Sequence, residues 1–207
     1  GNPPKILTDL SSQLKRTAHE LIDKNGRQNY SEFGKLEDSW PLIAAALPIF
    51  LTGENSELQE ICDWLHVFLD FQGHWDEWLY LTQKAEERAV NSGDYVEAGW
   101  RALQAGRVFR LRHEADCVFD SVASARKHWE KTRQCNTPGQ TSRAREEGNA
   151  YILEGKGHYL QKDYDSAMKC FEQARSRLQS LSEDPTYPLQ QQARRDFASA
   201  LNGLADA

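Results

Sequence analysis

This sequence lacks several features that define common protein classes. No 18-residue stretch is free of charged side chains, so no transmembrane helix is predicted. Residues 1–4 have no apolar run of the kind that a signal peptide needs. The four cysteines form no C-x-x-C pair, which favours single buried thiols in a reducing compartment over disulfides or metal ligands. We therefore expect a cytoplasmic protein that does not enter a membrane.

The charge balance argues against another group of partners. Lys and Arg total 25 against 31 Asp and Glu, so the formal net charge is −6. A chain with this excess of negative charge has no general attraction to nucleic acid or to anionic lipid. Hydrophobic residues make up 39% and charged residues 27%, which is typical of folded globular domains. Six tryptophans also need burial or a partner, and this predicts a well-packed core.

Strand patterns are missing as well, because alternating runs of Val, Ile and Thr never last beyond a few residues. Residues 49–137 contain no proline and carry apolar side chains at helical spacing. The sequence therefore predicts an all-α fold, an α-α superhelix of antiparallel hairpins with about nine helices. The expected helices cover residues 6–25, 34–51, 56–72, 75–91, 95–112, 114–132, 143–161, 164–181 and 187–206.

We expect one helical-repeat domain over residues 1–207. Its N-terminal helices lie in residues 1–53, two hairpins in 56–132, and a further hairpin with an unpaired terminal helix in 143–207. The Pro- and Gly-containing segment 134–142 is the clearest loop. The chain ends inside an amphipathic pattern that has no helix cap, so we expect it to be a piece of a longer protein.

An internal repeat supports the hairpin prediction. The windows that contain Gly106 and Gly155 align without a gap, and in each an alanine, Ala125 or Ala174, follows the glycine by 19 residues. Two antiparallel helices approach closely only where their side chains are small. We therefore expect both glycines to lie at helix contacts.

These windows resemble the tetratricopeptide-repeat family. The residues that match its pattern of small and aromatic positions are Tyr151, Gly155, Tyr164, Ala167, Phe171 and Ala174. Glu154 and His158 depart from the pattern. In the two preceding hairpins Val118, Val122 and Trp78 stand where the family has other residue types. The aligned alanines at 85, 125 and 174 are 40 and 49 residues apart, against the family period of 34.

A second resemblance covers most of residues 33–207. The stretch 33–47, followed by Trp64-Leu65 and by residues 71–75, is similar to the start of the helical repeats in STAND-type (NB-ARC-like) signalling ATPases. In that family the helical array is a sensor, and a partner bound there releases the ATPase for oligomerisation. The phosphate-binding motif G-x-x-x-x-G-K-[ST] does not occur in these residues.

The tetratricopeptide resemblance implies that the first helix of each hairpin lines a concave groove. Carried over residue by residue, the groove positions for a partner are Trp100, Leu103, Arg107, Arg110, Asn149, Lys156 and Tyr159, with Leu111, Ile152 and Leu160 beside them. In the first hairpin the same positions are Glu60, Asp63, Val67, Asp70 and Phe71. The groove would be acidic at one end and basic with aromatic residues at the other, which predicts an acidic protein or peptide partner. The alternative is an ordinary solvated charged face.

Other candidate sites have simpler explanations. Cys62 and His66 are four residues apart on one predicted helix and could hold a metal, but a packing role is favoured. Lys156 stands between Gly155 and Gly157, which could form a phosphate cradle, although helix packing again explains both glycines. We expect no cofactor and no metal.

The sequence thus favours a non-catalytic protein-binding or sensing scaffold. The alternative is a helical enzyme whose site is assembled from dispersed polar residues. An enclosed pocket with perturbed acids would favour the enzyme, and an open groove would favour the scaffold.

Overall fold

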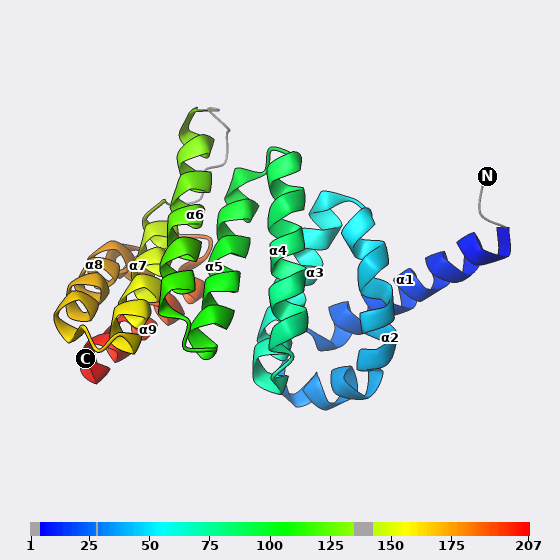
Figure 1. The fold of residues 1–207 in the computed structure, drawn as a ribbon, viewed down its shortest axis with the longest axis horizontal. Helices are drawn as coiled ribbons and strands as arrows, with labels where there is room; N and C mark the ends of the chain where they lie inside the picture. The colour runs from blue at the N-terminus through cyan, green and yellow to red at the C-terminus, as the bar shows by residue number, and fades with distance from the viewer. Residues whose placement is uncertain (1–4, 28, 135–142) are drawn as a thin grey trace. The chain divides into compact units, whose positions relative to one another are not determined.

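A computed structural model of the chain describes residues 5–27, 29–134 and 143–207, and within these ranges the protein is all-helical (Figure 1). The nine α-helices of this part of the chain are α1 (Lys5–Asn25), α2 (Phe33–Thr52), α3 (Asn55–Gln72), α4 (Trp75–Asn91), α5 (Tyr95–Leu111), α6 (Ala115–Gln134), α7 (Arg143–Leu160), α8 (Tyr164–Glu183) and α9 (Gln190–Asp206). A short 3-10 helix, η1 (Tyr30–Glu32), precedes α2. The all-α prediction is confirmed, and the helix boundaries agree closely. The predicted loop 134–142 lies outside the described residues except for Gln134, which belongs to α6.

The helices divide into two compact units, residues 1–97 and 98–207. The first three residues of α5 belong to the N-terminal unit and the rest of that helix to the C-terminal unit. The expectation of a single repeat domain stays a prediction. None of the described helices is long and apolar enough to cross a bilayer.

The N-terminal unit pairs α1 with α2 and α3 with α4. Its core is formed by fully buried apolar side chains from these helices, including Ile22, Phe33, Ile43, Phe50, Ile61, Leu65, Phe68 and Trp78. Cys62 is part of this core, and the ring of His66 contacts the carbonyl of Asp63 through Nδ1 at 2.8 Å. Within the described residues, no group of three or more potential metal ligands comes together. This arrangement supports the packing role for Cys62.

The C-terminal unit contains two hairpins, α5–α6 and α7–α8, and α9 packs against both α7 and α8 (Figure 1). The terminal helix is therefore not unpaired as the sequence suggested, because its small residues Ala200 and Gly203 are buried against its neighbours. The cluster that joins α5, α6 and α7 consists of Ala102, Leu103, Val118, Val122, Ala125, Trp129, Ala150 and Leu153. A second cluster, Ile152, Ala174, Leu178 and Ala200, joins α7, α8 and α9.

Four inter-helix turns use the same backbone motif. After α3, α4, α5 and α7, one residue has a positive φ, at Gly73 (80°), Gly93 (74°), His113 (61°) and Lys162 (61°). In each turn the following N–H donates to a carbonyl five residues earlier, as Glu114 does to Phe109 and Asp163 does to His158. This is the Schellman helix ending, and its left-handed residue is normally glycine because a Cβ is strained there. Two of the four turns therefore carry a side chain at a conformational cost.

We expect Lys162→Gly to stabilise the C-terminal unit by about 1 kcal/mol, since it removes the left-handed strain of a residue with a Cβ. Chemical denaturation followed by circular dichroism measures this change. The matched control is Lys162→Ala, which removes the same charge but keeps the Cβ and should give no such gain. Equal stability of the Gly and Ala variants would contradict the strain argument.

Close helix contacts in the C-terminal unit depend on the glycines predicted from the repeat. A Cβ on Gly155 of α7 would lie 2.8 Å from Cε1 of Phe171 on α8, and one on Gly203 of α9 would lie 2.5 Å from the same atom. The Phe171 ring is thus held between two glycine backbones. Gly106 of α5 meets Leu153 and Ser121 in a similar way. The packing role of the repeat glycines is confirmed by these contacts.

The structure adds a second pair of glycines that the sequence analysis missed. Gly99 of α5 is covered by the Trp129 side chain, and Gly148 of α7 by Leu178. Both the glycines and their covering residues are 49 residues apart, like Gly106 and Gly155. The 49-residue spacing between the last two hairpins is therefore a true structural repeat.

We expect Gly155→Leu to destabilise the protein by about 1–3 kcal/mol or more, because the new side chain must displace the Phe171 ring. The free energy of unfolding from urea denaturation is the measurement. Gly34→Leu is the matched control, since a Cβ at Gly34 meets nothing within 4 Å. If both variants unfold like the parent, Gly155 is not a close-contact position.

Candidate functional site

The seven predicted groove residues separate into three groups in the structure. Leu103 is 1% exposed and belongs to the core between α5, α6 and α7, so its assignment to a partner-binding surface is wrong. Apolar side chains of α6 and α7 cover this position. The other six residues lie on α5 and α7 and form two distinct arrangements, a polar network and a pocket.

The polar network links α5, α7 and α9 through buried or half-buried groups. The carboxylate of Asp196 accepts hydrogen bonds from Arg145 Nε and Asn149 Nδ2, both at 2.8 Å. The Arg145 guanidinium lies 4.8 Å from the ring centre of Trp100, and Arg107 donates to Asn149 Oδ1 at 3.5 Å. Three predicted groove residues, Trp100, Arg107 and Asn149, are therefore engaged in contacts between helices. Asn149 is also only 5% exposed.

The remaining three, Arg110, Lys156 and Tyr159, line one pocket of about 420 Å³. This volume lies within the range of small-ligand sites. The rest of the lining comes from the α5–α6 turn and from α7, α8 and α9, and consists of His113, Leu160, Phe171, Ser199, Asn202, Gly203 and Asp206. Three of the seven predicted groove residues thus lie in one pocket, whose α9 wall the sequence analysis did not name, and their role in partner binding stays a prediction. We call this site the α5/α7/α9 pocket.

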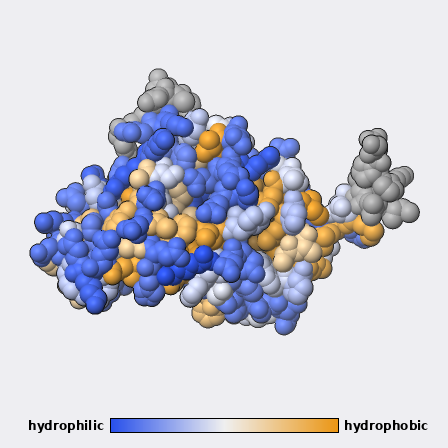
Figure 2. All heavy atoms as spheres, in the orientation of Figure 1, coloured by the Kyte–Doolittle hydropathy of each residue, from blue (hydrophilic) through white to orange (hydrophobic). Residues whose placement is uncertain are grey.

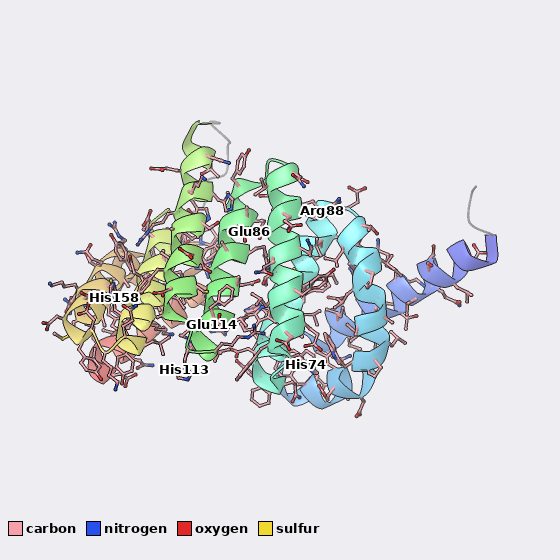
Figure 3. The ribbon with its side chains drawn as sticks, in the orientation of Figure 1. His74, Glu86, Arg88, His113, Glu114 and His158 are labelled. Carbon is pink, nitrogen blue, oxygen red and sulfur yellow. The ribbon has the colours of Figure 1, made fainter. Side chains whose placement is uncertain are left out.

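The pocket lies where α5 and α7 end and beside α9. Arg110 is the second-last residue of α5, Tyr159 is the second-last residue of α7, and Asp206 lies on α9. Figure 3 shows His113 at the turn between α5 and α6. The turn residue and the α9 residues come from segments far apart in the sequence, and no local pattern indicated that they meet.

The polar side chains of the pocket differ in how they are engaged. Lys156 Nζ contacts Ser199 Oγ at 3.4 Å, a long hydrogen bond between α7 and α9. For Arg110, His113 and Asp206, no side-chain hydrogen bond or ion pair exists within the described part of the chain. Tyr159 is 40% exposed, and its ring packs edge-on against Tyr164 at 5.4 Å. The pocket therefore contains two charged groups, Arg110 and Asp206, without side-chain partners in the described part of the chain, beside the accessible ring of Tyr159.

The groove positions of the first hairpin form a separate surface on the N-terminal unit. Glu60, Asp63, Asp70 and Phe71 are exposed, as predicted, and Val67 is half-buried. Glu60 and Asp63 line an acidic recess of about 590 Å³. Hydrophilic side chains likewise dominate the visible face in Figure 2, with hydrophobic areas between them.

The glycines that flank Lys156 serve packing. Gly157 faces the Phe119 ring and Gly155 faces Phe171, so neither backbone is open to a phosphate. None of the described cysteines forms a disulfide, and burial raises the pKa of Cys170 to about 11, which keeps that thiol protonated near neutral pH.

Comparison with known proteins gives no further guide to the class of this chain. No family model, no curated protein and no solved structure matches it. The α5/α7/α9 pocket is therefore interpreted from its own chemistry.

Removing the central carboxylate of the polar network should destabilise the C-terminal unit. We expect Asp196→Ala to cost about 1–3 kcal/mol, because it leaves the half-buried Arg145 and the buried Asn149 without their shared acceptor. Thermal and urea denaturation measure the loss. The control is Asp120→Ala, at an exposed position of α6, which should change stability by less than about 0.5 kcal/mol. Similar losses of stability in both variants would show that the network stabilises the unit no more than an exposed carboxylate does.

Proposed function

We propose that this chain is a non-catalytic protein-binding module, and that the α5/α7/α9 pocket binds a carboxylate-bearing segment of a partner protein. The observation that carries the proposal is the convergence of Arg110, Lys156 and Tyr159 on one pocket, with the Arg110 guanidinium free of side-chain partners within the described residues. A guanidinium offers five donors in a planar fork that suits a carboxylate. An arginine left unpaired at a pocket is therefore available to a ligand.

The character of the pocket walls also favours binding over chemistry. Tyr159 presents aromatic surface in the pocket, on which the apolar stem of a partner residue can pack. Asp206 is the single carboxylate among the described lining residues. A pair of carboxylates with separated pKa values, the usual arrangement for acid–base catalysis, would need a second acid there.

We further propose that the module is cytoplasmic and acts as the sensor region of a larger signalling protein. This proposal rests on the resemblance of residues 33–75 to the start of the repeats in STAND-type ATPases. Reading the gene upstream of this segment tests it. A nucleotide-binding G-x-x-x-x-G-K-[ST] motif is the expected finding, and a gene without one would leave an adaptor that works alone.

The binding proposal is tested on a peptide array probed with the 207-residue chain at two salt concentrations. The test variant is Arg110→Ala combined with Lys156→Ala. It should capture acidic peptides about 1.5- to fivefold more weakly per removed charge contact, and its capture should depend less on salt. Arg107 is left intact, because its contact with Asn149 makes it part of the polar network.

The control variant is Lys169→Ala combined with Arg175→Ala, which removes two exposed positive charges from α8. It has the same net charge as the test variant, so it separates the pocket from general electrostatics. Circular dichroism should show that both variants remain folded. Equal capture by the test and control variants would reject the α5/α7/α9 pocket as the binding site.

A further inference from the structure

The electrostatic balance of the α5/α7/α9 pocket limits which ligands it can take. Arg110 and Lys156 supply two positive charges, and Asp206 supplies one negative charge. The C-terminal ends of α5 and α7 also border the site, and each helix end carries roughly −0.5 elementary charge. Both ends are partly neutralised, since the turn N–H groups of His113 and Lys162 donate to carbonyls of the last helical turns. The pocket is therefore close to balanced rather than strongly positive.

A nearly balanced pocket with separate charges favours a ligand of mixed charge. A phosphoryl group carries about −1.5 to −2 charges at neutral pH and would lie close to the Asp206 carboxylate and the ends of α5 and α7. A carboxylate carries one charge, which Arg110 can satisfy with two parallel hydrogen bonds. Asp206, which has no side-chain partner within the described residues, can then pair with a cation on the same ligand.

His113 adds an imidazole to the pocket at a strained turn. Its φ of 61° lies in the left-handed region; the equivalent residues are glycines in two other turns, Gly73 and Gly93, and a lysine with a side chain of its own, Lys162, in the third. A strained backbone that retains a side chain is an observation from which function can be inferred. Here the retained side chain is an imidazole that is exposed and lines the pocket beside Arg110. Packing does not explain it, because the side chain is not buried.

We propose that the α5/α7/α9 pocket selects a partner segment that carries one carboxylate next to a lysine or arginine, with His113 as a specificity-determining residue. Arg110 and His113 hold the carboxylate, Asp206 pairs with the neighbouring cation, and Tyr159 supports the side-chain stems between them. Serine or threonine phosphorylation at the acidic position is disfavoured by Asp206. The inference rests on the proposed binding function and specifies the ligand of the same site.

The test uses a degenerate peptide array probed with the full 207-residue chain. The central position is fixed as Glu, phosphoserine or Gln, and one of the four neighbouring positions is fixed as Lys or Ala. The parent should capture Glu peptides with a neighbouring Lys about 1.5- to fivefold better than those with Ala, and better than phosphoserine peptides. Asp206→Asn should abolish the preference for Lys and increase the capture of phosphoserine peptides.

A third protein, the His113→Gly variant, distinguishes a role of His113 in binding from a role in folding. It should capture Glu peptides about 1.5- to fivefold more weakly while its unfolding temperature rises, since glycine relieves the strained turn. Lower capture together with lower stability would indicate a purely structural role for His113. Unchanged capture would remove His113 from the site.

The outcomes distinguish this inference from the proposed function. If the parent captures no Glu peptide, the proposed function itself fails. If it captures Glu peptides without a preference for Lys, or prefers phosphoserine, the binding function stands and the mixed-charge inference is wrong. A preference for Lys that survives Asp206→Asn also overturns the inference.

Discussion

The C-terminal unit depends on the contact between the Phe171 ring and the two glycines that enclose it. Gly155 and Gly203 bring the backbones of α7 and α9 against the same aromatic side chain of α8. Because interiors are packed to crystal-like density, this contact fixes the separation of the three helices. The same ring lines the α5/α7/α9 pocket, so the pocket and the core share a residue. The position of the pocket is thus tied to a close packing contact of the core.

Much of the fold could be predicted from the sequence. Breakers such as Asn25-Gly26 and Ser92-Gly93 mark real helix ends, and the spacing of Gly106 and Gly155 indicated real helix contacts. These features are local, or they repeat, so a single sequence can reveal them. The glycines at 99 and 148 were missed because the residues that cover them, on α6 and α8, are identified only by tertiary structure.

The site was predicted less completely, for two physical reasons. The groove positions came from a family with a 34-residue period, whereas the last two hairpins repeat after 49 residues. Leu103 is consequently buried in the core, and the side chain of Asn149 forms hydrogen bonds between helices. His113 and Asp206 were not predicted, because their proximity depends on how α5 and α9 pack against α7, which no local pattern indicates. Arg110, Lys156 and Tyr159 still line one pocket, because these charged and aromatic side chains remain at least partly accessible.

The repeated Schellman turn has a consequence for how such a protein can diversify. The left-handed residue lies at the surface in each of the four turns, and the hydrogen bonds of the motif involve only backbone atoms. Its side chain can therefore be exchanged without disturbing the core, at a fixed cost of about 1–2 kcal/mol relative to glycine. Each turn of this kind is a position where a different surface side chain can be carried at a small loss of stability. In this chain two of the four turns carry such a side chain, a histidine at one turn and a lysine at the equivalent turn 49 residues later.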